Sequence, residues 1–237
     1  MINAFSTNFL LYDDFFRERN PIIHSYYLHG KLLKNVDCTK YLGVNISSNL
    51  RWNKHVQAIT SKANRTLGFL KRNLRINSTS LKAVAYKSLV RPQLEYASAA
   101  WDPYTESDIY KLEMVQRRAA RYVLNDYQRT SSVSDMLKAL GWPLLKARRK
   151  VSRLVHLYKI HHNLTDANKE NYLRRVATKR ATRHVHTTAY QVPRSKTDYH
   201  LNSFFPRTIR EWNGLPPSLC QTESLTSFKQ EIQKLCY

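Results

Sequence analysis

Lysines and arginines spaced along helical segments are the side chains of this sequence best suited to chemistry, and that chemistry is phosphate binding. Basic side chains held at a regular rise on a helix can contact successive phosphates of a nucleic acid and release its condensed counterions. The candidates, which lie off the apolar positions of their segments, are Lys54, Lys62, Arg65, Arg72, Arg117, Arg118, Arg121, Arg148 and Arg149. We therefore expect each segment to have one apolar face and one face for anions.

The basic charge is concentrated in the middle of the chain. Among 237 residues, 39 Lys and Arg stand against 17 Asp and Glu, which gives a formal net charge of +22. Residues 51–180 carry +18 of this charge, residues 1–50 carry +1, and residues 181–237 carry +3. A solvated surface usually mixes both signs, so the imbalance favours a nucleic acid as partner over a merely soluble surface.

The sequence gives little support for a nucleotide-binding loop, a cysteine-based site or a metal site. The five glycines lie too far apart for a G-x-G-x-x-G turn or a Walker loop, and the three cysteines have no paired short spacing. The neighbours His161 and His162 would diverge on a helix, while His184 and His186 have no Cys, Asp or Glu at ligand spacing. The sequence predicts no metal site, no cofactor and no catalytic residue.

The first residues do not match a targeting signal. They lack a basic start, and Asp13 and Asp14 interrupt the apolar stretch well before it reaches the length of a membrane span. We expect an intracellular protein of the nucleus or cytoplasm that is neither secreted nor bound to a membrane.

Hydrophobic periodicity indicates which elements must position the basic side chains. Two extended runs around Gly30 and a β-branched run after it predict a small antiparallel sheet from about Ser25 to Ser47. Apolar residues three and four apart then predict helices over 52–74, 80–101, 106–124, 133–140 and 144–161. In the second of these, Leu81, Val84, Ala85 and Leu89 are expected to be buried, and Pro92 to start a new segment or kink the helix.

The last part of the chain shows a mixed pattern. Residues 184–192 and 198–201 resemble short strands, residues 204–212 a helix that ends at a left-handed Gly214, and residues 224–235 a final amphipathic helix. The predicted fold class is α+β and predominantly α. It comprises a small N-terminal sheet (residues 1–50), a basic helical bundle (51–166), a basic linker (167–183) and a small mixed C-terminal subdomain (184–237).

Several phrases of the sequence resemble one protein family. In chain order they are YLGV (41–44), RPQLEYASAAWDP (91–103), LEMVQRRAARYV (112–123), LGWPLLKARR (140–149) and SFFPRTIREWNGLP (203–216). They are similar to the region after the polymerase core in reverse transcriptases of LINE-type (non-LTR) retrotransposons, in particular jockey-like elements. The resemblance covers roughly residues 19–235.

The resemblance implies roles for particular residues. Tyr41, Leu42 and Gly43 would belong to the end of the palm, in a strand similar to the primer grip, although Tyr41 and Leu42 could equally face the core. The basic helices would form a thumb that follows the template–primer duplex. Lys54, Lys62, Arg65 and Arg72 would then be candidates for phosphate contact.

The carboxylates that such a polymerase needs are not evident. Reverse transcription uses two metal ions held by carboxylates, which the family supplies from a palm aspartate and an aromatic-x-Asp-Asp hairpin upstream of the YLGV phrase. Tyr12-Asp13-Asp14 looks similar but lacks the preceding aromatic and a partner strand, so we interpret it as a chance match. The expectation is a non-catalytic fragment, and Mg²⁺ would be needed only by a full-length polymerase.

The leading hypothesis is a retrotransposon-derived fragment that binds RNA or RNA–DNA duplex without sequence preference. Its further partners would be the missing palm and fingers of the parent polymerase. Two alternatives stay open: part of an active reverse transcriptase whose palm lies upstream, or a pseudogene product without a function.

Overall fold

The computed structural model describes residues 27–28, 31–32, 36–176 and 188–237, and the chain divides into two compact units, Met1–Asp37 and Cys38–Tyr237. In the first unit, strand β1 (Tyr27–Leu28) pairs antiparallel with β2 (Lys31–Leu32). Asp13, Asp14, the histidines at 184 and 186 and the linker residues 177–183 lie outside the described residues.

The second unit begins with a separate β-hairpin. Strand β3 (Cys38–Tyr41) pairs antiparallel with β4 (Val44–Ser47), and Tyr41 stands opposite Val44. The predicted single sheet is therefore wrong, because the four strands form two sheets of two strands each in the described part of the chain. The predicted fold class, α+β with mostly helix, is confirmed.

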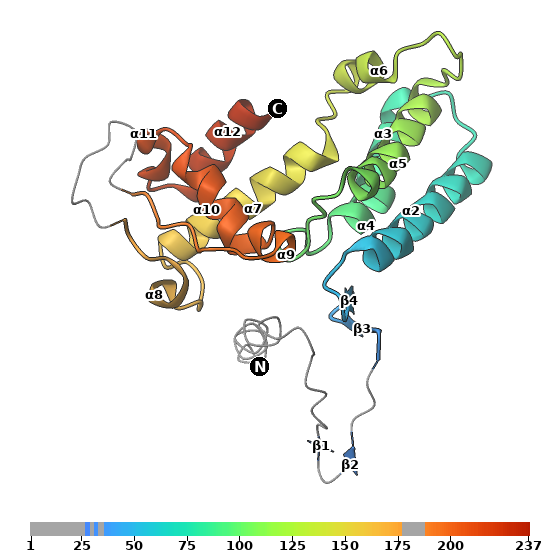
Figure 1. Cartoon of the computed structure of the whole chain (residues 1–237). Helices are drawn as coiled ribbons and strands as arrows, with labels where there is room; N and C mark the ends of the chain where they lie inside the picture. Colours follow the sequence, from blue (N-terminus) through green and yellow to red (C-terminus); the bar gives the residue numbers. More distant parts are fainter. Residues whose placement is uncertain (1–26, 29–30, 33–35, 177–187) are drawn as a thin grey trace. The chain divides into compact units, whose positions relative to one another are not determined.

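Helices after the hairpin enclose a first hydrophobic core (Figure 1). They are α2 (Asn53–Asn73), α3 (Thr79–Ala85), the π-helical turn η1 (Tyr86–Val90), α4 (Arg91–Glu95), α5 (Glu106–Leu124) and α6 (Val133–Ala139). Helix α2 packs along α5, and both bury the apolar stripe that the periodicity predicts. Val56, Leu67, Leu112 and Val115, for example, are at most 2% exposed.

The predicted buried face of residues 80–101 is wrong. Leu81, Val84 and Leu89 are at least half exposed, whereas Tyr86 and Val90 are buried. Leu81 and Val84 belong to α3, where Lys82 is the buried residue, and the buried positions after it are Tyr86, Val90 and Leu94. Leu89 lies within the π-helical turn η1, which has more residues per turn than an α-helix and so rotates this side chain off the buried face. Helix α4 then begins with Pro92 in its first turn and ends at Glu95, well short of residue 101.

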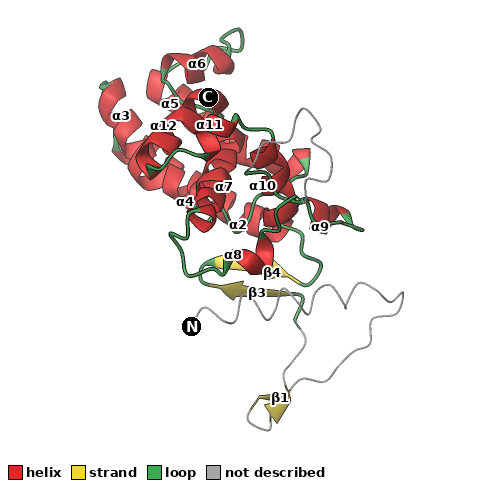
Figure 2. Ribbon diagram, turned by 90° about the vertical axis from the view of Figure 1, so that its left-hand side faces the viewer, coloured by secondary structure: helices red, strands yellow, loops and turns green. Residues whose placement is uncertain are grey.

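A second core forms around helix α7 (Leu145–His161). Helices α10 (Phe204–Asn213) and α12 (Leu225–Cys236) pack on it (Figure 2). The shorter helices of this part are α8 (Lys169–Tyr172), α9 (Asp198–Leu201) and α11 (Pro217–Cys220). Leu145 at the start of α7 belongs to the first core and residues 151–160 to the second, so α7 connects the two.

Two predictions in the C-terminal part are corrected. Residues 198–201 form the helix α9 and no strand, because the Thr197 hydroxyl accepts a hydrogen bond from the His200 amide and caps the helix. Gly214 follows α10 with φ −88°, which is not left-handed. Of the predicted strand 184–192, the described residues contribute one isolated bridge, between Tyr190 and Arg175. Within the described ranges, none of the helices has the length and apolarity needed to cross a bilayer.

Candidate nucleic-acid interface

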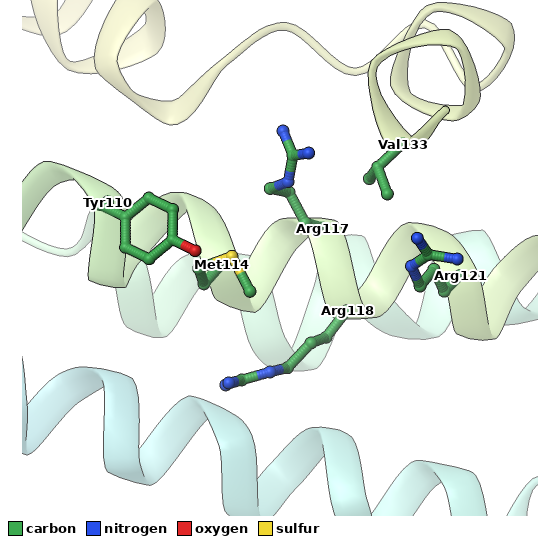
Figure 3. Close-up of a pocket in the computed structure, with 6 residues that line it drawn as sticks. All are labelled: Tyr110, Met114, Arg117, Arg118, Arg121 and Val133. Atoms are coloured by element: carbon green, nitrogen blue, oxygen red, sulfur yellow. The ribbon is translucent and has the colours of Figure 1, made fainter. Parts of the chain in front are cut away.

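The exposed face of α5 carries three of the predicted phosphate-binding residues together. Arg117, Arg118 and Arg121 line one surface depression of about 360 Å³ with Tyr110, Met114 and Val133 (Figure 3). The spacing of these α5 residues places them on one side of the helix, because positions three or four apart are neighbours on a helix surface. Val133 comes from the start of α6. We call these six residues the α5 site.

None of the three arginines of the α5 site forms a direct salt bridge among the described residues, although the charges of Arg117 and Arg121 act on the nearby carboxylates of Glu113 and Asp126. The Nη1 of Arg118 donates to Oδ1 of Asn64 at 3.2 Å. The Nη1 of Arg121 donates to the carbonyl oxygens of Asp126 (3.4 Å) and Gln128 (3.0 Å). These neutral acceptors orient two of the guanidinium groups without cancelling their charge, so the face keeps a net positive charge.

Helix α2 adds further positive charge beside α5. Its candidate residues, all exposed, are Lys54, Lys62, Arg65 and Arg72. Lys71 of α2 lies near the α5 site, where burial and, after it, the charge of Arg118 lower the pKa of its ammonium group. Lys71 and Arg118 thus place two positive charges close together where α2 and α5 meet.

Two candidates on α7 have a different environment. Arg148 bonds both carboxylate oxygens of Glu95, with Nη2 3.0 Å from Oε2. Arg149 is completely buried, its Nε lies 2.7 Å from Oδ1 of Asp102, and burial lowers its pKa to about 10. The expectation that Arg149 lies on a face open to anions is therefore wrong, and Arg148 is engaged in an ion pair.

The buried arginines of α7 belong to an ion network that joins α7 to α10. Asp102 contacts Arg149, Arg153 and Arg207, and the Arg207 Nη1 lies 3.3 Å from its Oδ2. Glu211 accepts from Arg153 at 2.7 Å. Helix α7 is covered on both sides, so its charged side has to be neutralised internally.

The YLGV phrase spans a hairpin: Tyr41 ends β3 and Val44 begins β4, so the prediction of one continuous strand through Leu42 and Gly43 is wrong. Leu42 and Gly43 connect β3 to β4, with positive φ values of 44° and 87°. The Tyr96 hydroxyl donates to the Leu42 carbonyl at 3.1 Å. A Cβ at position 43 would lie 3.1 Å from the Tyr96 ring, so glycine allows this close approach. Tyr41, Leu42 and Gly43 are all exposed.

The described residues give no sign of a catalytic metal centre. None of their His, Cys, Asp and Glu side chains gather in a group of three or more that could hold a metal ion. Glu113, a carboxylate close to the α5 site, accepts hydrogen bonds from the amides of Leu145 and Lys146. It therefore caps the N-terminus of α7, and burial raises its pKa.

The sequence interpretation missed the apolar part of the α5 site. Tyr110 and Met114 precede the arginines by three to eleven positions, at helical spacing. That signal is present in the sequence, because residues 110, 114, 117, 118 and 121 follow the same three-and-four pattern as a buried stripe. Val133 could not be found in this way, since its position depends on how α6 packs against α5.

Comparison with known proteins gives one line of similarity. The chain is 28% identical, over 145 residues, to the retrovirus-related Pol polyprotein from the type-1 retrotransposable element R1 2 of Nasonia vitripennis. The match covers 57% of this chain and 33% of that protein, so the chain corresponds to about a third of the relative. No protein-family model and no solved structure matches the chain. The similarity supports a region related to non-LTR retrotransposon polyproteins.

Proposed function

We propose that this chain is a non-catalytic fragment of a jockey-like retrotransposon reverse transcriptase that binds RNA or RNA–DNA duplex through α5 and α2. The observation that carries the proposal is the α5 site, where three arginines share one helix face without a direct salt bridge in the described part of the chain. In this proposal the helices around the first core are the thumb of the parent polymerase.

Contacts to phosphates explain why the binding would be independent of sequence. Phosphate contacts position a protein on nucleic acid but carry no base information. Each contact releases counterions, so the affinity falls steeply as salt is added. Helix α2 packs along α5, and its Asn64 and Lys71 lie beside Arg118, so in this proposal the exposed cations of α2 add further phosphate contacts.

The proposed fragment does not polymerise DNA by itself. The carboxylates that hold Mg²⁺ would lie in a palm that, together with the fingers, is a partner of this chain inside the cell. The chain matches 33% of its relative, which also favours a second candidate: a segment of an active reverse transcriptase. In that case primer extension would need the palm as well as this chain. Magnesium-dependent extension by the isolated chain, abolished in Asp13→Ala, would contradict both candidates and make Asp13 part of a catalytic site.

The test is a binding titration at several salt concentrations. Fluorescence anisotropy would follow a labelled RNA and an RNA–DNA duplex as wild type and the triple variant Arg117→Gln, Arg118→Gln, Arg121→Gln are added. The variant should bind at least tenfold more weakly at low salt, and the slope of log affinity against log salt should fall by about 2 to 3, for three lost phosphate contacts.

A matched control removes the same charge elsewhere. Arg210, Lys229 and Lys234 are exposed on α10 and α12, and their joint replacement by Gln should leave most of the affinity and the slope intact. An equal loss of affinity in both triple variants would show that binding depends only on the net charge of the chain and not on the α5 site. Absence of binding by wild type at low salt would refute the proposed function.

A further inference from the structure

An exposed tyrosine shares the α5 site with the arginines. Tyr110 is 62% exposed, and among the described residues it makes no hydrogen bond, ion pair or ring contact. In Figure 3 its ring lies at one end of the site beside Met114, and Arg121 and Val133 lie at the other end. A large aromatic side chain without a partner in the fold is available to a ligand.

The α5 site combines two kinds of surface in one depression. Tyr110, Met114 and Val133 provide apolar area, and the arginines provide charge. The volume of about 360 Å³ is at the lower end of the range for small-ligand sites. A ligand that fits this arrangement carries one flat apolar group beside negative charge.

We propose that the α5 site holds an unpaired nucleotide of single-stranded RNA, with the base stacked on Tyr110 and the adjacent phosphates on Arg117 and Arg121. This inference rests on the proposed function, because it assumes that the α5 face binds RNA. It goes further by naming the state of the nucleic acid.

The distances along the helix suit a strand that runs parallel to α5. Arg117 lies seven residues after Tyr110, about 10 Å along the helix axis, and Arg121 lies about 6 Å further. A base on the tyrosine and two successive phosphates on the arginines would thus follow the helix in order. Arg118, held towards α2 by Asn64, is left to contact a neighbouring part of the strand.

Stacking on Tyr110 distinguishes a single strand from a duplex. In a duplex the bases are stacked on each other, and the grooves of A-form RNA do not offer their faces to a side chain. Aromatic stacking therefore takes place with unpaired bases, and it tolerates any sequence because every base has a π-face. A site that used phosphate contacts alone would not need the tyrosine.

The experiment compares Tyr110→Ala and Tyr110→Phe with wild type on three probes. The probes are a single-stranded RNA of about 12 nucleotides, the same strand with abasic positions, and a blunt duplex of the same length. Tyr110→Ala should bind the single strand at least fivefold more weakly, as expected for one lost stacking contact. Tyr110→Phe should keep wild-type affinity, and neither variant should alter duplex binding more than twofold. Tyr237→Ala, which removes another exposed tyrosine at the end of α12, should leave binding of all three probes unchanged.

Several outcomes would overturn the inference while leaving the proposed function in place. One is arginine-dependent binding of RNA that Tyr110→Ala does not weaken. A second is an equal loss of affinity for the single strand and for the duplex in Tyr110→Ala. A third is an abasic strand that binds wild type as well as the intact strand does. Self-association that is lost in Tyr110→Ala, with RNA binding unchanged, would assign this face to a second copy of the chain. If wild type binds no RNA at all, the proposed function fails first.

Discussion

Helices α5 and α7 each carry three arginines at similar spacing, but the two sets have opposite environments. On α5, Arg117, Arg118 and Arg121 line a surface depression, and in the described part of the chain the hydrogen bonds of Arg118 and Arg121 go to neutral acceptors. On α7, residues 148, 149 and 153 pair with Glu95, Asp102 and Glu211. Identical side chains thus line an open surface on one helix and form buried or partly buried ion pairs on the other.

The difference depends on what covers each helix. Helix α5 packs through one stripe and leaves the opposite face open, whereas α7 lies between the two cores and is buried on both sides. A buried charge must be paired, since its transfer out of water is costly. Carboxylates from distant parts of the sequence therefore neutralise the α7 arginines and leave those of α5 available.

The largest expected effect comes from the centre of the buried network. Asp102→Asn keeps the shape but removes the negative charge that three arginines share. The free energy of unfolding should fall by about 3 to 5 kcal/mol, because the buried guanidinium groups lose their partner. Urea denaturation followed by circular dichroism measures this change.

Glu231→Gln is the control for Asp102→Asn. It removes one carboxylate from the exposed pair with Lys234, so stability should change by less than about 0.5 kcal/mol. RNA affinity of Asp102→Asn, measured where it is folded, should equal that of wild type. A variant as stable as wild type would show that the network contributes nothing to the stability of the fold.

Low pH should destabilise the fold through His55, a buried histidine of α2. His55 is 2% exposed against Trp101, accepts a hydrogen bond from the Asn45 amide at Nδ1, and has its pKa lowered by burial to about 4. The unfolded chain binds a proton near pH 6.5. The contribution of neutral His55 to the free energy of unfolding is therefore fully present above about pH 6.5. It declines as the pH falls, because the unfolded chain binds a proton and the folded chain does not, and it is lost below about pH 4.

Between pH 7 and pH 4, proton binding by His55 should lower the free energy of unfolding by about 3 kcal/mol. Denaturation curves at several pH values would measure it as the part of the pH dependence that disappears in His55→Gln. The slope against pH, and not the stability at one pH, is the quantity to compare, because the substitution also changes packing. Identical slopes in wild type and variant would contradict the prediction.

Much of the fold could be predicted from hydrophobic periodicity. Helices α2 and α5 follow the expected stripes because each buries one face in a single core. The π-helical turn η1 could not be predicted, since it changes the number of residues per turn and thereby exposes Leu89, which lies within it. The two hairpins were read as one sheet because strand spacing does not say which strands pair.

The site was predictable only in part. The α5 arginines could be found from their helical spacing, and this is where the structure gathers them. Arg149 was misassigned because a sequence does not show that Asp102, 47 residues away, will lie beside it. Charge patterns identify a polar face, but whether solvent or another helix covers that face depends on tertiary packing.

The smallest effects separate the two arginine environments most directly. Lys62→Gln removes an exposed charge on α2, so stability should change by less than about 0.5 kcal/mol while the salt slope of RNA binding falls by about 1. Arg148→Gln breaks the pair with Glu95. It should lower stability by about 1 to 2 kcal/mol and leave the salt slope unchanged. If Arg148→Gln reduced the slope as much as Lys62→Gln does, α7 would also contact nucleic acid, and the division between a binding helix and a stabilising helix would fail.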